Sequence, residues 1–191
     1  MTFHLYSPRI RGGFGISPLT TIATSWFDSF RLGDADGDGT PDLLVTGSTI
    51  DNTSGDSAEA WVQVHRIASR AGRAQVVEAR EIFRDQYRTS GVLNAGINIL
   101  GIGDATGDGV SDVTIEVLNR GFDDASLRAI VIQSPWSAQG QPPLPHTVLR
   151  AENPAGTFAQ IGVIFRLADA DGDGVLDLFR RDQTLELYRG L

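Results

Sequence analysis

Three stretches of nine residues constrain this chain more than any other feature. They read Asp34-Ala-Asp-Gly-Asp-Gly-Thr-Pro-Asp42, Asp104-Ala-Thr-Gly-Asp-Gly-Val-Ser-Asp112 and Asp169-Ala-Asp-Gly-Asp-Gly-Val-Leu-Asp177. Each has oxygen-bearing side chains at its first, third, fifth and ninth positions and glycine at its fourth and sixth. A chain that curls round one ion meets it with alternate residues, and glycine permits the tight, left-handed turns that this requires. Without a cation, three or four carboxylates so close together would repel one another.

This arrangement predicts three cation-binding loops. Hard cations such as Ca²⁺ take six to eight oxygen ligands at about 2.3–2.6 Å. The expected side-chain ligands are Asp34, Asp36, Asp38 and Asp42; Asp104, Thr106, Asp108 and Asp112; and Asp169, Asp171, Asp173 and Asp177, with backbone carbonyls of Thr40, Val110 and Val175. A solvated acidic turn is the alternative for one such stretch, but three copies at matching positions argue against it. The middle loop, with a hydroxyl at Thr106 in place of a carboxylate, should bind most weakly.

The stretches are not EF-hand loops. An EF-hand needs a glutamate at its twelfth position, where this chain has Val45, Ile115 and Arg180. The residues on both sides of each loop are apolar and strand-like rather than helical. Each loop is therefore expected to join two antiparallel strands as a β-hairpin.

A strand, the pattern Asp-x-Asp-x-Asp-Gly-x-x-Asp and a second strand together resemble the FG-GAP/VCBS repeat of integrin α-subunit propellers and many bacterial secreted proteins. The resemblance implies an all-β chain of about three four-stranded antiparallel units of the β-propeller type, each with Ca²⁺ in its hairpin. Thr106 departs from the pattern. The first aspartates of the loops lie 70 and 65 residues apart, which leaves room for one such unit per repeat. We expect one domain, with a partial blade at 1–24, repeats at 25–90 and 91–156, and a partial repeat at 157–191.

The strands expected in the first repeat are 26–33, 43–46, 61–67 and 75–83. The second repeat should have strands at 97–103, 113–118, 127–133 and 146–151, and the third at 161–168, 178–180 and 184–188. Residues 2–8 and 20–24 should form strands at the N-terminus. A helix competes over 75–87, where alanine, glutamate, arginine and glutamine favour it, although the repeat position favours a strand. The prolines within 134–145 predict a long loop.

Composition limits the environment and the partners. The chain has 191 residues and a formal net charge of −8, which argues against nucleic acid as a partner. It has no cysteine and so no disulfide framework. No apolar run is long enough to span a membrane, and residues 1–17 lack the apolar region of a signal peptide. Calcium sites of the weak extracellular type nevertheless predict an extracellular, cell-surface or periplasmic location, with an export signal removed or another export route.

Catalytic signatures are missing from the sequence. The three histidines (His4, His65 and His146) fall on separate expected strands without a partner motif, and there is no Gly-x-Ser-x-Gly elbow. Spacing leaves open paired carboxylates for glycosidic chemistry among Glu116, Asp123, Asp124 and Glu152. We expect no enzymatic activity.

The expected function is a calcium-stabilised binding or assembly module for protein–protein interaction or adhesion. Propellers usually close with four to eight blades, so about three blades imply a protein partner or self-association. One alternative is a lectin, or a non-catalytic part of a polysaccharide-active enzyme, with carbohydrate in a groove lined by Trp26, Trp61 and Trp136. The other is a structural subunit of a filament or larger complex.

Overall fold

The computed structural model describes residues 2–5, 20–23, 28–51, 53, 56–70, 73–88, 91–122, 125–133, 145–153, 164–181 and 185–189. Within these residues the protein is all-β, with thirteen strands and no helix. The expected fold class is confirmed at this level. No helix long and apolar enough to cross a membrane occurs in the described part of the chain.

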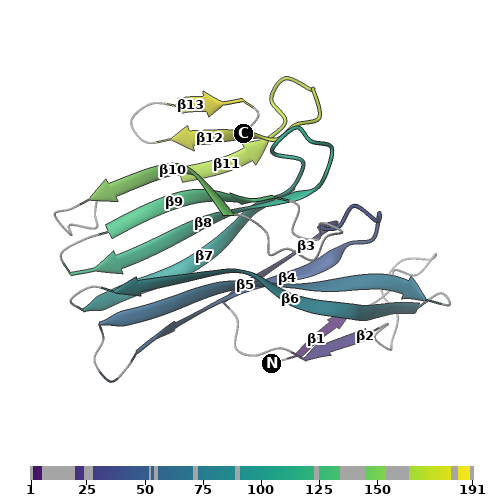
Figure 1. Cartoon of the computed structure of the whole chain (residues 1–191), viewed down its shortest axis with the longest axis horizontal. Coiled ribbons are helices and arrows are strands. Elements are labelled where there is room, and N and C mark those ends of the chain that lie inside the picture. Colours follow the sequence, from purple (N-terminus) through teal and green to yellow (C-terminus); the bar gives the residue numbers. More distant parts are fainter. Residues whose placement is uncertain are drawn as a thin grey trace, which may run out of the picture.

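The strands form three main antiparallel sheets and one small pair (Figure 1). Sheet 1 has the order β3 (Ser29–Gly33), β4 (Asp42–Ile50), β5 (Ser57–Arg70) and β6 (Arg73–Arg88). Sheet 2 consists of β7 (Val92–Gly103), β8 (Asp112–Gly121), β9 (Ala125–Ile132) and β10 (Pro145–Asn153). Sheet 3 consists of β11 (Ile164–Ala168), β12 (Asp177–Arg181) and β13 (Leu185–Tyr188). The pair is β1 (Thr2–Leu5) and β2 (Thr20–Ala23). In each main sheet every strand pairs with the next one along the chain.

Each acidic loop connects the first and second strands of its sheet. The register places the residue before each loop opposite the ninth loop residue: Gly33 faces Asp42, Gly103 faces Asp112 and Ala168 faces Asp177. The expected β-hairpins are therefore present, with strands where an EF-hand would have helices. We call the loops loop 1 (34–42), loop 2 (104–112) and loop 3 (169–177).

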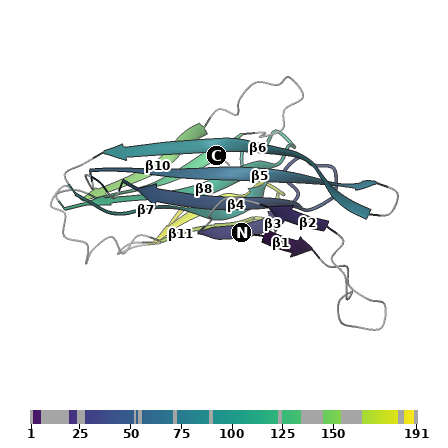
Figure 2. The same cartoon turned by 90° about the horizontal axis from the view of Figure 1, so that it is seen from below.

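The segment in which a helix competed is a strand. β6 pairs with β5 from Arg73 opposite Arg70 to Arg88 opposite Ser57. Its buried Ile82 and Phe83 join the core between sheets 1 and 2, so packing outweighs the local helix propensity of this segment. β5 and β6 run along much of the molecule in Figure 2. Residues 134–144 of the proline-containing loop expected at 134–145 lie outside the described part of the structure. Parts of the expected strands at 2–8, 20–24, 26–33, 161–168 and 184–188 also lie outside it.

The sheets stack face to face in chain order (Figure 1). Between sheets 1 and 2 the core contains fully buried aliphatic side chains from both, including Leu44 and Val62 from sheet 1 and Val113 and Ile115 from sheet 2. A second core joins the other face of sheet 2 to sheet 3; its buried members are Leu127, Ala129, Phe165 and Leu178. Because sheet 2 is covered on both faces, consecutive residues of its inner strands are buried, as in the apolar run Ala129–Ile132 of β9.

The stacking brings the first strands of the three sheets, and hence the three loops, to one side of the molecule, at the right in Figure 1. One hollow is lined by the ends of β3 and β7 together with Leu167 of β11 and Leu176 of loop 3. The backbone N–H of Leu176 donates to the carbonyl of Asp104 in loop 2 at 2.7 Å. Within the described residues the sheets form an open stack and no closed ring.

Candidate metal centres

The first aspartate of each loop is held in the same way in all three. In loop 1, Oδ1 of Asp34 accepts the N–H of Gly37 and Oδ2 accepts the N–H of Gly39, both at 2.8 Å. Asp104 accepts the corresponding glycine N–H groups at 2.7 and 2.8 Å, and Asp169 does so at 2.7 and 3.1 Å. These bonds hold the first carboxylate inside the turn. A carboxylate oxygen has further acceptor capacity after accepting one hydrogen bond.

The glycines are needed for this turn. Gly37 and Gly39 have φ values of 77° and 82°, and the fourth and sixth residues of the other two loops lie between 77° and 89°. Glycine adopts this left-handed conformation without the steric penalty that a side chain brings. The left-handed conformation of the two glycines therefore points their N–H groups at the carboxylate of the first aspartate.

The ninth aspartate is the buried anchor of each loop. Asp42 and Asp112 are fully buried, and Asp177 is 2% exposed. Oδ2 of each accepts the N–H of the alanine at the second position, at 3.1, 3.0 and 2.9 Å in loops 1, 2 and 3. In loop 1, Oδ1 of Asp42 also accepts the N–H of Ile67 on β5 at 2.8 Å. This bond joins the loop to the third strand of the sheet.

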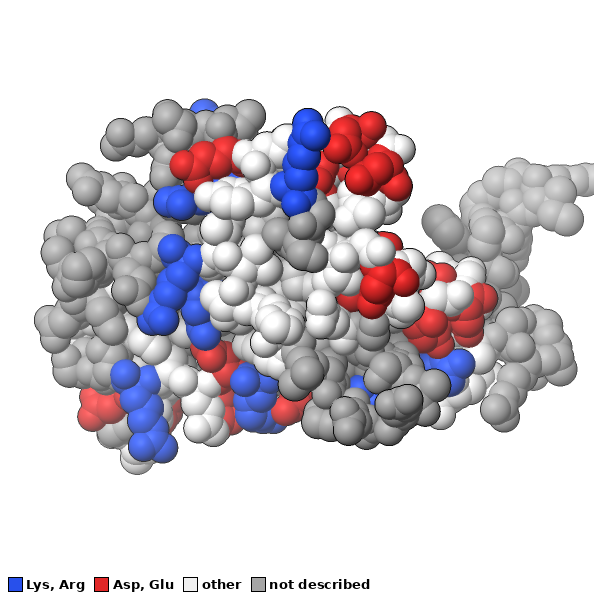
Figure 3. Space-filling view, turned by 45° about the horizontal axis from the view of Figure 1, so that its top comes forward, with Lys and Arg blue, Asp and Glu red and all other residues white. Residues whose placement is uncertain are grey.

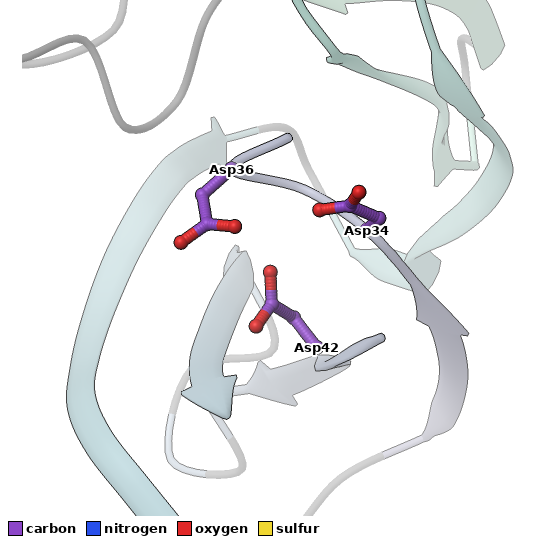
Figure 4. Close-up of side chains that lie close together, drawn as sticks. All are labelled: Asp34, Asp36 and Asp42. Atoms are coloured by element: carbon purple, nitrogen blue, oxygen red, sulfur yellow. The ribbon is translucent and has the colours of Figure 1, made fainter. Parts of the chain in front are cut away.

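Carboxylates at the first, third and ninth positions converge in two of the loops. Asp34, Asp36 and Asp42 each offer an oxygen within 4.8 Å of the others, and so do the equivalent residues of loop 3, Asp169, Asp171 and Asp177. Figure 4 shows the three carboxylates of loop 1 pointing toward a common space. In Figure 3 acidic side chains gather at the right of the molecular face, where the loops lie. An all-oxygen, carboxylate-rich set of this kind fits a hard divalent cation.

Loop 2 has the same shape with a different third residue. Thr106 donates from its hydroxyl Oγ1 and from its backbone N–H to Oδ2 of Asp112, both at 3.1 Å. The hydroxyl thus lies beside the ninth carboxylate. Loop 2 combines two carboxylates with a neutral oxygen at the positions where loops 1 and 3 have three carboxylates.

The fifth aspartate of each loop has another contact. Asp38, Asp108 and Asp173 each accept the N–H of the seventh residue on Oδ1 at 2.8 Å. These three are outside the convergent groups formed by the first, third and ninth positions. Ligation by the fifth carboxylate, and by the carbonyls of Thr40, Val110 and Val175, stays a prediction.

Burial leaves one carboxyl with a strongly shifted pKa. Burial of Asp42 raises its pKa from 3.8 to about 6, with the charges of Asp36 and Asp38 adding to the effect and the two backbone hydrogen bonds opposing it. Burying an anion beside other anions is unfavourable, so a bound cation would favour the ionised form of this carboxyl. A cation bound in loop 1 would therefore offset the repulsion between Asp42 and the charges of Asp36 and Asp38.

Two arginines that local spacing did not indicate lie at the loops. Arg66 of β5 donates from Nε to Oδ2 of Asp36, and its Nη2 lies 3.9 Å from Oδ2 of Asp38. Arg189, just after β13, places Nη1 3.5 Å from Oδ2 of Asp171. The hydrogen bond that Arg66 donates to Asp36, followed by the surrounding negative charges, raises the pKa of Arg66. These arginines are distant in sequence from the loop residues they meet, so only the pairing of the third strand could have indicated them.

The other residues considered for function lie elsewhere. His65 is buried in sheet 1, and burial lowers its pKa. His146 is exposed on β10. Trp61 packs on Gly47 and joins the apolar cluster of Leu43, Val45 and Ile67, so it does not line an open groove with its described neighbours. Side chains of His4, Trp26, Trp136, Asp123, Asp124 and Glu152 lie outside the described part of the structure.

Glu116 is a half-buried carboxyl at the contact between sheets 2 and 3. Burial raises its pKa, while Arg166, the backbone N–H of Phe165 and the side chain of Asn98 act in the opposite direction. These surroundings account for the residue as a polar link between β7, β8 and β11.

No protein-family model, curated protein or solved structure matches the chain. The evidence for function therefore comes from the loops and from the sheets that carry them.

Proposed function

We propose that the protein is a calcium-stabilised binding and assembly module built from blades of the FG-GAP/VCBS type. The observation that carries the proposal is the recurrence of one hydrogen-bonded loop between the first and second strands of three successive stacked sheets. A solvated acidic turn has no need to repeat its glycine conformations and its buried ninth carboxylate three times. A cation-binding hairpin needs both.

The proposed ligands follow from the geometry of the loops. The residues that would hold the ions are Asp34, Asp36 and Asp42; Asp104, Thr106 and Asp112; and Asp169, Asp171 and Asp177, with the fifth aspartates and seventh carbonyls as further ligands. A bound Ca²⁺ supplies positive charge that neutralises the clustered carboxylates. The loop backbone orients the first carboxylate and the alanine N–H orients the ninth. Such closed sites stabilise a fold, which supports a binding role over catalysis.

The stacking of the sheets supports the propeller-type assignment. Propeller blades are four-stranded antiparallel sheets arranged around an axis, with four to eight usual for closure. Besides the small pair, the described residues contain two four-stranded sheets and one three-stranded sheet, in which β13 is one of the two edge strands. An edge strand offers unpaired backbone groups to another chain. We therefore propose that the module works with a protein partner or a second copy, in an extracellular or periplasmic setting where calcium is millimolar.

The experiment is a measurement of native mass and melting temperature with calcium and with EDTA. Binding to the folded state alone adds about 2.7 kcal/mol per site at a hundredfold excess over Kd. We expect up to three bound calcium ions and a melting temperature many degrees lower in EDTA. An unchanged melting curve in EDTA, with metal shown to be absent, would contradict the proposal.

The assembly part has its own measurement. Light scattering in millimolar calcium should give an oligomer for the full chain, or for the chain mixed with its partner. Deletion of residues 1–24 tests whether the N-terminal strands join another copy. If the full chain is monomeric and the shortened chain stays equally folded and monomeric, strand exchange is excluded and an external partner remains.

A further inference from the structure

One residue on the third strand of each sheet, or directly after it, lies beside the acidic loop. In sheet 1, Leu43 pairs with His65, so the next pair outward is Asp42 and Arg66. In sheet 2, Val113 pairs with Ile132, which sets Gln133 at the equivalent place. In sheet 3, Leu178 pairs with Tyr188, which sets Arg189 there. We call Arg66, Gln133 and Arg189 the third-strand residues.

The third-strand residue and the third loop residue vary together. Arg66 contacts Asp36 in loop 1, and Arg189 lies beside Asp171 in loop 3. In loop 2 the same two places carry Thr106 and Gln133, and these two residues line one pocket. Where the loop has a third carboxylate the strand supplies a guanidinium, and where the loop has a hydroxyl the strand supplies a neutral amide.

This pairing equalises the charge of the three sites. Loops 1 and 3 have four carboxylates each, and the third-strand arginine leaves three net negative charges. Loop 2 has three carboxylates and a neutral third-strand glutamine, which also leaves three. A count restricted to the loops would make loop 2 the weakest site, whereas a count that includes the third strand makes the three sites equal.

We propose that Arg66 and Arg189 are tethered counter-charges that lower the calcium affinity of loops 1 and 3 and bring it close to that of loop 2. This inference rests on the proposed function, because it concerns the affinity of the same sites. The guanidinium and the divalent cation share one carboxylate, so each weakens the hold of the other. In the metal-free protein the arginine takes over part of the neutralisation that the cation supplies.

The two arginines should differ in strength. The side chain of Asp36 is only 6% exposed and that of Arg66 is 36% exposed, whereas those of Asp171 and Arg189 are 34% and 69% exposed. Solvent screens the second pair more strongly. A register shift in the pairing of β5 with β6 lies between Arg66 and Ile67, and such bulges re-aim side chains. Loop 1 is therefore the site at which to test the proposal.

The first test replaces Arg66 with the residue that loop 2 uses. At a dielectric constant close to that of water, one unit charge about 6 Å from a divalent cation changes the affinity for that cation by about tenfold. Arg66→Gln should raise the calcium affinity of loop 1 by about this factor, and Arg66→Lys should leave it close to the wild-type value. Arg84→Gln is the matched control, because Arg84 is similarly exposed and contacts only carboxylates outside the loops, Glu59 and Glu81. Amide NMR signals of the loop glycines report each site separately.

The second test builds the loop 1 arrangement into loop 2. Thr106→Asp alone adds a carboxylate without a counter-charge, so loop 2 should become the tightest of the three sites. The double variant Thr106→Asp with Gln133→Arg should return its affinity toward the wild-type value of loop 1. This test does not depend on whether the Arg66 variants fold.

The outcomes separate the two proposals. If the wild-type protein binds no calcium by native mass spectrometry, the proposed function and this inference both fail. If it binds calcium but Arg66→Gln binds equally or more weakly in loop 1, only the counter-charge inference fails. Weaker binding would make Arg66 a positioning residue, and equal binding would show that it does not affect the site. Failure of Gln133→Arg to weaken the Thr106→Asp site would overturn the inference in the same way.

Discussion

Replacement of Asp42 by asparagine separates a cation site from a purely structural turn. Asparagine has the same shape, but it carries no charge and offers one acceptor oxygen in place of two. Asp42 accepts N–H groups from Ala35 and Ile67, so the variant leaves one of these donors facing an amide NH₂ group. The effect of the substitution should depend on calcium, because the lost charge matters most when a cation is bound.

The magnitude in the metal-free protein follows from two opposing effects. A pKa raised from 3.8 to about 6 means that the buried charge destabilises the folded state by about 3 kcal/mol above pH 6. Asparagine removes this cost. The orphaned N–H costs about 1–3 kcal/mol. We therefore expect Asp42→Asn to change the free energy of unfolding little in EDTA at neutral pH.

With calcium the result should be different. Loss of the ion from loop 1 removes about 2.7 kcal/mol of stabilisation at a hundredfold excess over Kd. The difference in unfolding free energy between calcium and EDTA should shrink by this amount in the variant. Urea denaturation under both conditions measures it, with Asp85→Asn, outside the loops, as the control. An equal loss of stability by Asp42→Asn in calcium and in EDTA would refute the proposal that loop 1 binds a cation.

The same carboxyl predicts a dependence on pH. Because the pKa of Asp42 is raised in the folded state, the folded metal-free protein takes up a proton near pH 6 that the unfolded chain takes up only near its ordinary value. The contribution of Asp42 to stability in EDTA should therefore increase as the pH falls from neutral through 6. The Asp42→Asn variant should lack this contribution. If the free energy of unfolding in EDTA depended on pH in the same way for wild type and variant, this prediction would be wrong.

Three further changes test the fold around the loops. His65 is buried and its pKa is lowered, so wild-type stability should fall as the pH drops below its ordinary value of 6.5, and His65→Gln should reduce that fall in acid denaturation curves. Asp85→Ala should cost about 2 kcal/mol in urea unfolding, because it leaves two partly buried donors from sheet 2 without their acceptor. Gly47→Ala should lower the melting temperature, because its Cβ would lie 2.2 Å from Trp61 and the ring would have to move.

Each of these changes has a matched control or a contradicting result. Identical acid profiles for wild type and His65→Gln would show that the histidine does not titrate between the folded and unfolded states. The Asp85→Ala cost should be the same with calcium and with EDTA, so a strong calcium dependence would contradict its role as a link between sheets. Gly39→Ala meets no atom within 4 Å and should cost only the backbone strain of about 1–2 kcal/mol.

The sequence alone determined the local features. The apolar flanks predicted the hairpins, and the spacing of aspartate and glycine predicted that the first, third and ninth carboxylates of loops 1 and 3 converge, because both depend on interactions between near neighbours in the chain. Asp34 and Asp42 thus meet as expected. The fifth aspartates, also predicted as ligands, are outside these convergent groups. At β6 the composition favours a helix and the repeat position favours a strand; pairing with β5 and burial of Ile82 and Phe83 outweigh the helix propensity.

The surroundings of the loops depend on strand pairing and sheet stacking. Arg66 reaches Asp36 from 30 residues away, because β4 and β5 pair in a register that sets it opposite the ninth loop residue. Asp85 links sheet 1 to Asn119 and Arg128 of sheet 2, and Glu116 meets Arg166 at the contact with sheet 3. No local spacing encodes these contacts, because they depend on strand register and on the stacking of sheets. In loops 1 and 3 the converging carboxylates thus lie within nine residues of one another, whereas the arginines beside them come from the third strand of the sheet or the residue after it.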